Sequence, residues 1–104
     1  MRLTLDIDER DWWAWAVFYS LRDSGLFWRV EIWKTRKGHH IVAYGGLDPI
    51  TVDILRASLG DDQLRIAIDR VKPPRIPKQV LFNRKNGYEA ELLEVWEDGL
   101  DGKL

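Results

Sequence analysis

Residues 27–46 have the sequence FWRVEIWKTRKGHHIVAYGG, which indicates two β-strands joined by a short turn. Apolar and polar side chains alternate over residues 27–33, and residues 39–44 form a second extended run. The polar, basic connection between the runs ends in Gly38. Two extended runs with a short glycine-containing connection are typical of a β-hairpin. We therefore predict an antiparallel pair of strands in the middle of the chain.

The segments before the hairpin predict a strand and a helix. Leu3, Leu5 and Ile7 alternate with polar residues, which predicts a strand over residues 2–7. Residues 10–24 are apolar over most of a helical surface, and Gly25 follows where a helix C-cap belongs. The sequence thus begins with one strand and one apolar helix.

After the hairpin, the Asp48-Pro49 pair predicts the start of a second helix that ends at Gly60. Pro73, Pro74 and Pro77 indicate a rigid extended link, which is followed by a predicted strand over residues 78–82. Residues 85–87 are predicted to form a turn, and residues 88–96 a final strand or short helix.

Residues 62–71 have two interpretations. Leu64, Ile66 and Ile68 alternate with Arg65, Ala67 and Asp69, which favours a strand. As a helix, the same segment would be capped by Asp62, and Arg65 would pair with Asp69 at i,i+4. With the strand, the order of elements predicts an α+β fold of the ferredoxin-like or RNA-recognition-like split βαβ type, with two helices on one face of an antiparallel sheet.

Size and composition predict a single domain over residues 1–104, with a frayed acidic tail from about residue 97. About 45% of the residues are hydrophobic and six are Trp, which is enough apolar material for a real core. The chain has no Cys, so disulfides and thiolate metal sites are excluded. Because the sequence contains neither a membrane-length apolar run nor a signal peptide, we expect a cytoplasmic protein without a membrane partner.

Charge is unevenly distributed along a chain whose net charge is −1. Basic residues dominate between positions 65 and 85, and acidic residues dominate after position 88. The basic segment is compatible with binding a polyanion, although two exposed faces of opposite sign that partly pair would explain the pattern equally well. Its candidate nucleic-acid-binding residues are Arg65, Arg70, Lys78, Arg84 and Lys85.

Asp6 and Asp8 are the first candidates for chemistry. Residues two apart on a strand share a face, so these carboxylates would lie about 6–7 Å apart and could share a divalent cation. Solvent exposure and helix capping are the simpler interpretation of the pair. His39 and His40 point to opposite faces of the third strand, so one of them shares the face of the acidic pair. Asp69 would end the fourth strand nearby.

The order of these motifs resembles the archaeo-eukaryotic primase superfamily. The motifs are Leu5-Asp6-Ile7-Asp8, then the basic Arg36-Lys37-Gly38-His39-His40, then Ile68-Asp69. The resemblance implies an RNA-recognition-like core in which Asp6, Asp8 and Asp69 bind Mg²⁺ or Mn²⁺ as the catalytic carboxylates. It implies that His40, assisted by Arg36 and Lys37, contacts a nucleotide triphosphate. The function implied is metal-assisted nucleotidyl transfer in DNA replication, with a site that is active or degenerate.

The small, Trp-rich, cysteine-free chain also resembles proteins of archaeal viruses and plasmids, which would place it in a host cytoplasm. Two other functions compete with nucleotidyl transfer. One is a non-catalytic module that binds single-stranded nucleic acid, stacking bases on exposed aromatic residues such as Trp33, Tyr44 and Phe82. The other is a homo-oligomeric interaction protein, with a homodimer formed through the Trp12–Trp15 part of the first helix.

Overall fold

The structure is a computed structural model that describes residues 1–8, 10–81, 84–85 and 88–98. Four strands form its main sheet, in the spatial order β1-β3-β2-β6 with antiparallel neighbours throughout. Their bounds are β1 Leu3–Asp8, β2 Arg29–Lys34, β3 Gly38–Tyr44 and β6 Glu91–Glu97. Two short strands, β4 (Arg84–Lys85) and β5 (Tyr88–Glu89), pair separately just before β6. The predicted central hairpin is therefore confirmed as β2 and β3.

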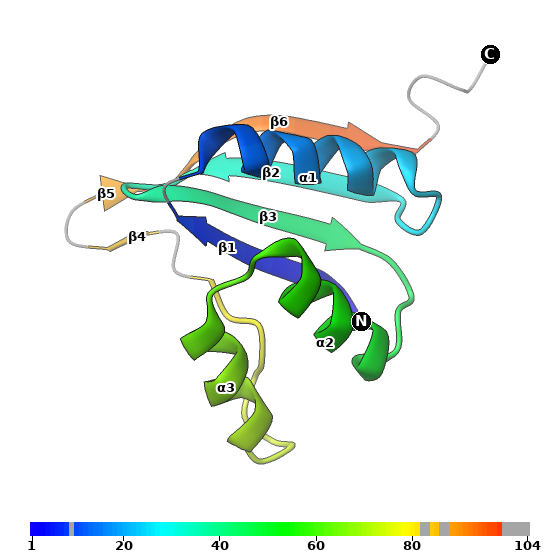
Figure 1. Ribbon diagram of the computed structural model, residues 1–104, viewed down its shortest axis with the longest axis vertical. Coiled ribbons are helices and arrows are strands. Elements are labelled where there is room, and N and C mark those ends of the chain that lie inside the picture. Colours follow the sequence, from blue (N-terminus) through cyan, green and yellow to red (C-terminus); the bar gives the residue numbers. More distant parts are fainter. Residues whose placement is uncertain (9, 82–83, 86–87, 99–104) are drawn as a thin grey trace.

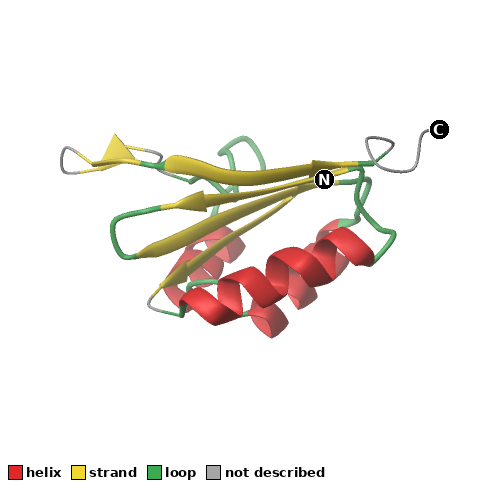
Figure 2. Cartoon of the chain, turned by 90° about the horizontal axis from the view of Figure 1, so that it is seen from above, coloured by secondary structure: helices red, strands yellow, loops and turns green. Residues whose placement is uncertain are grey.

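Three helices lie on one side of the sheet (Figure 2). They are α1 (Asp11–Asp23), α2 (Pro49–Leu59) and α3 (Gln63–Val71). The start of α2 agrees with the sequence, because the Asp48 side chain accepts a hydrogen bond from the Thr51 amide at 2.8 Å and Pro49 opens the helix. Its end also agrees, because Gly60 adopts a left-handed conformation with φ 88°.

The core lies between the sheet and helices α1 and α2. Successive strand residues face opposite sides, so β1 contributes Leu3, Leu5 and Ile7 to the core and leaves Thr4, Asp6 and Asp8 on the open face. The buried face of α1 packs against the sheet with Ala14, Val17, Phe18 and Leu21. Val52 of α2 completes the same cluster. Burial of one sheet face fixes the register, and the register then determines which polar residues share the open face.

The α+β class with an antiparallel sheet is confirmed, but the finer ferredoxin-like arrangement is not. Residues 64–69 belong to helix α3, so the strand favoured by their alternation is wrong. Asp62 caps this helix, accepting from the amides of Leu64 at 2.9 Å and Arg65 at 3.4 Å. The described part of the predicted 78–82 strand, residues 78–81, lies outside any sheet and bends at Gln79, whose φ is 58°. The fourth strand of the sheet is instead β6, which pairs with β2.

The Trp-rich helix α1 is more fully packed than its composition implies. Trp13 donates from Nε1 to the carbonyl oxygen of Leu59 at 2.7 Å, and both Trp13 and Trp15 pack against the core. Trp12, in contrast, is 71% exposed. The exposed large apolar side chains of this helix are thus Trp12 and Tyr19, and the homodimer through Trp12–Trp15 stays a prediction.

Candidate functional site

The open face of the sheet brings together an acid and an imidazole from adjacent strands. Asp6 of β1 lies directly opposite His40 of β3, and Asp8 lies opposite Gly38. The Nε2 atom of His40 is 3.7 Å from Oδ1 of Asp6. The His40 side chain is buried, that of Asp6 is 25% exposed, and Asp8 is exposed. We call Asp6, Asp8 and His40 the acid–imidazole patch.

Electrostatics set Asp6 apart from an ordinary surface carboxylate. Its burial, followed by repulsion from Asp8, raises its pKa from 3.8 to about 6. Arg65 opposes this shift, while Asp61 and Asp62 add to it. Because the folded-state pKa lies above the ordinary value, Asp6 favours folding most below about pH 4, and this contribution is lost as the pH rises through about 6.

We expect the Asp6 carboxyl to titrate near pH 6 in the wild type, and at lower pH in Asp8→Asn, because that substitution removes the neighbouring charge. Carboxyl ¹³C chemical shifts measured against pH test this directly. Asp48 is the internal control, since hydrogen bonds from Thr51 hold its pKa below 3.8. An Asp6 pKa near 3.8, or one that Asp8→Asn leaves unchanged, would contradict this account.

The hairpin turn places the other residues of the predicted triphosphate contact. Arg36 and Lys37 are exposed in the turn, at the end of the sheet where Gly38 pairs with Asp8. His39 lies on the opposite face, where its side chain is 3% exposed against the ring of Trp15 and its Nδ1 is 3.6 Å from Oδ1 of Asp11. Burial, then Lys34, lowers the pKa of His39. His40 is thus the histidine on the face of the acidic pair.

Asp69 does not join the acid–imidazole patch but lies in a buried ion cluster with Arg56. Its Oδ2 accepts from Nη1 of Arg56 at 2.8 Å and from the amide of Gln79 at 2.9 Å. Lys72 lies 3.0 Å from its Oδ1. Burial alone would raise the pKa of Asp69, but the bonds from Gln79, Lys72 and Arg56 outweigh it and hold the pKa below 3.8.

Arg65, which was predicted from the sequence to bind nucleic acid, lies in the same ion cluster. Arg65 Nη1 donates to both carboxylate oxygens of Asp61 at 2.8 Å and to the carbonyl oxygen of Thr4 at 3.2 Å. Arg56 Nε binds the Oδ2 atom of Asp61 at 2.6 Å. We call Arg56, Asp61, Arg65, Asp69 and Lys72 the Arg56 cluster. Arg65 is thus committed to internal contacts, whereas Nη2 of Arg56 is a buried donor without a hydrogen-bond partner among the described residues.

Gln79 is a structural residue that no pattern in the sequence singles out. Its Oε1 accepts from the Thr4 amide at 2.8 Å, and its Nε2 donates to the Arg2 carbonyl oxygen at 2.8 Å. Together with Asp61, which accepts from the Asp6 amide at 2.8 Å, it satisfies the outer edge of β1. Side chains therefore cover the edge that a neighbouring strand would otherwise cover.

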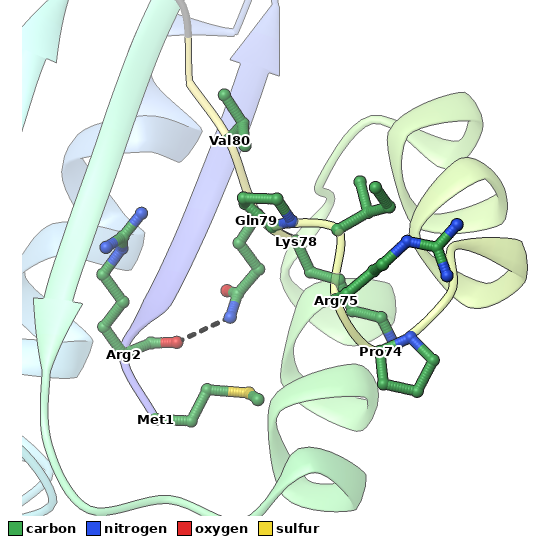
Figure 3. Close-up of a pocket in the computed structure, with 9 residues that line it drawn as sticks. Met1, Arg2, Pro74, Arg75, Lys78, Gln79 and Val80 are labelled. Atoms are coloured by element: carbon green, nitrogen blue, oxygen red, sulfur yellow. Dashed lines mark hydrogen bonds between the residues drawn. The ribbon is translucent and has the colours of Figure 1, made fainter.

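A pocket of about 600 Å³ opens between the start of β1 and the proline-rich segment 74–80 (Figure 3). Gln79 belongs to the proline-rich segment, and its side chain reaches the start of β1. The guanidinium groups of Arg2 and Arg75 extend to opposite sides of Gln79 (Figure 3). Lys78 is the third cation among the described lining residues, none of which is acidic. The remaining lining is apolar and comes from Met1, Pro74, Ile76, Pro77 and Val80. We call this the basic pocket.

The remaining predicted cations are divided between α3 and β4. Arg70 is exposed on α3. Arg84 and Lys85 form β4, and their side chains lie outside what the structure describes. Among the predicted aromatic contacts, Trp33 donates to Oε1 of Glu31 at 3.1 Å and Tyr44 packs against Trp28, with ring centroids 5.5 Å apart. Phe82 lies outside the described residues.

A metal centre would need several carboxylate or imidazole ligands close together. In the described ranges, no group of three or more His, Asp or Glu side chains is arranged to hold a metal ion. The Arg56 cluster explains this in part, because Asp69 already neutralises Arg56 and Lys72. The three-carboxylate set of Asp6, Asp8 and Asp69 is therefore not brought together, and the Mg²⁺ or Mn²⁺ site stays a prediction.

Among the described helices, none has the length and apolar character needed to cross a bilayer. Comparison of the chain with protein-family models, curated proteins and solved structures gives no match.

Proposed function

We propose that this domain binds single-stranded nucleic acid through phosphate contacts at the basic pocket, without performing nucleotidyl transfer. The observation that carries this proposal is the described lining of the pocket, which includes the three cations Arg2, Arg75 and Lys78 and no carboxylate, in a chain of net charge −1. Cations grouped in this way attract a phosphate backbone, which supplies most of the affinity in sequence-independent binding.

The apolar part of the lining favours a nucleic acid over a small inorganic anion. Pro74, Pro77 and Val80 present apolar surface beside the cations. A nucleotide offers both a charged phosphate and the less polar faces of its sugar and base, so it matches a mixed surface of this kind. A flexible single strand can adapt to a short, open pocket more easily than a rigid duplex can.

The acid–imidazole patch supports binding more than catalysis. Asp6 and Asp8 would repel a phosphate, so the backbone is expected to approach β1 from the Arg2 end. Asp6 and His40 lie close together, but Asp69, the third carboxylate that the primase resemblance implies, is held by Arg56. In this proposal the domain is a degenerate relative of primase-like cores, and the substrate-binding function remains.

Charge reversal in the basic pocket tests the proposal. In Arg75→Glu/Lys78→Glu, the affinity for a fluorescein-labelled oligothymidylate should fall at least tenfold, because two phosphate-binding cations become repulsive anions. The slope of log K against log[salt] should also shrink by about 0.7 for each phosphate that the variant no longer neutralises. Fluorescence anisotropy at several salt concentrations measures both quantities.

Two controls make the result specific. Arg22→Glu reverses a charge on α1, away from the pocket, and should change the affinity little. Asp6→Asn and Asp8→Asn should leave binding intact or strengthen it, because each removes a negative charge. If the pocket variant binds as the wild type does, or if binding is lost in Asp6→Asn and Asp8→Asn instead, the basic pocket is not the binding site.

A further inference from the structure

Helix α3 turns its apolar side away from the protein. Leu64, Ile68 and Val71 are 67%, 46% and 81% exposed, although they follow each other at spacings of four and three residues. That spacing places them on a single face of the helix. The opposite face contributes Asp69 and Arg65 to the Arg56 cluster. The inward face thus carries ions beside the buried Ile66, while three aliphatic side chains face outward.

The outward face of α3 has no cover among the described residues. Figure 1 shows α3 at one end of the molecule, beside α2 and beyond the strands of the sheet. Helix α2, which packs next to α3, exposes two more aliphatic side chains, Ile50 at 74% and Ile54 at 59%. Soluble monomers seldom leave this many large aliphatic side chains exposed on neighbouring elements, and such patches mark interaction surfaces.

The charges at the ends of α3 favour a second copy of the same chain as the partner. Asp62 caps its N-terminus, and the exposed Arg70 stands in its last turn. In an antiparallel pair related by a two-fold axis, the acidic end of each helix meets the basic end of the other. Ala67, exposed between Leu64 and Val71, lies near the middle of the stripe, where a small side chain lets two helices approach closely.

We infer that the chain forms a homodimer in which the α3 helices of two copies pack antiparallel through Leu64, Ala67, Ile68 and Val71. Size limits the contribution of α3 alone, because a nine-residue helix is about 14 Å long. A stable interface buries about 800 Å² on each partner. The exposed Ile50 and Ile54 of α2 are therefore included in the interface as its flank.

Oligomeric state, measured by sedimentation equilibrium, is the first test. The wild type should be dimeric at micromolar concentration, and Ile68→Glu should weaken dimerisation at least tenfold because it buries two like charges near the axis. Trp12→Glu is the control, since Trp12 is also exposed, at 71% against 46% for Ile68, but lies on α1. A wild type that is monomeric at all accessible concentrations overturns the inference, as does a dimer that Trp12→Glu disrupts and Ile68→Glu does not.

Cross-linking tests the antiparallel geometry independently of stability. The chain has no Cys, so a single introduced cysteine can pair only with its copy. Ala67→Cys should form a covalent dimer rapidly under mild oxidation, because position 67 lies close to the proposed axis. Ala16→Cys, on the exposed side of α1, should remain largely monomeric. Faster cross-linking of Ala16→Cys than of Ala67→Cys would overturn the proposed interface.

Discussion

Replacing Arg56 by Met is expected to destabilise the folded domain by about 3–5 kcal/mol. The side chain of Arg56 is 2% exposed, and its guanidinium binds Asp61 at 2.6 Å and Asp69 at 2.8 Å. Methionine has a comparable shape but no charge, so both carboxylates would lose their main buried partner. A domain of this size is stable by only about 5–15 kcal/mol, so the loss is a large fraction of the total.

Urea denaturation, followed by tryptophan fluorescence, measures the free energy of unfolding of each variant. Arg70→Met is the matched control, because it makes the same chemical change at an exposed position on α3 and should cost less than about 0.5 kcal/mol. Adding Asp69→Asn to Arg56→Met should cost less than the two single substitutions together, because the carboxylate no longer needs a cation. Equal losses in Arg56→Met and Arg70→Met would mean that the buried ion pairs contribute nothing.

The Arg56 cluster also connects the parts of the protein that matter for function. Through Asp61 and Arg65 it binds the outer edge of β1, and through Asp69 it holds the amide of Gln79. Gln79 in turn forms one side of the basic pocket. The cluster therefore fixes the proline-rich segment beside β1, and the loss of Arg56 should also weaken nucleic-acid binding in this proposal.

Most of the first two thirds of the fold could be predicted because each signal there has one physical meaning. The alternation in β1 places Leu3, Leu5 and Ile7 in the core, and Asp48-Pro49 and Gly60 determine where α2 begins and ends. Two-residue periodicity also predicted that one of His39 and His40 shares the face of Asp6, and the structure shows that it is His40. That Asp6 and His40 are direct neighbours follows from the β1–β3 register, which the Gly38–Asp8 pair closes at one end.

Residues 62–71 could not be predicted, because the burial of their side chains runs against their polarity. Leu64 and Ile68 are exposed, whereas Asp69 is 4% exposed. Because apolar side chains are expected to be buried, the alternation of these residues predicts a strand with its apolar face in the core. The helix is stabilised by Asp62 as its N-cap and by ion pairs with residues outside the segment. Arg65 pairs with Asp61, at i−4, and Asp69 with Arg56, so the expected Arg65–Asp69 pair is not the one that forms.

The contacts of Gln79 were equally hidden, because they join residues about 75 positions apart in the sequence. Nothing in a single glutamine after a run of prolines indicates that its amide will satisfy the edge of the first strand. The side chains of Gln79, Asp61 and Arg65 bind the outer edge of β1, where none of the described strands pairs.

Substitution of Gly38 by Ala is expected to destabilise the domain by about 1–3 kcal/mol and to disturb the acid–imidazole patch. A Cβ atom at position 38 would lie 2.1 Å from the carbonyl oxygen of Ile7 and 2.8 Å from Cα of Asp8. Both are backbone atoms of β1, so no side chain can move aside to relieve the clash. Strands β1 and β3 would have to separate at the end where Asp8 and Gly38 pair.

Gly46→Ala is the control, because a Cβ atom at that position meets nothing within 4 Å and the backbone there is not left-handed. Its free energy of unfolding should stay within about 0.5 kcal/mol of the wild type. In Gly38→Ala the pKa of Asp6 should also move from about 6 toward 3.8, because separation of the strands admits water to the carboxylate and so reduces the desolvation that raises its pKa. If Gly38→Ala instead keeps both the wild-type stability and an Asp6 pKa near 6, the close approach of β1 and β3 at Gly38 cannot be what holds Asp6 in its buried position.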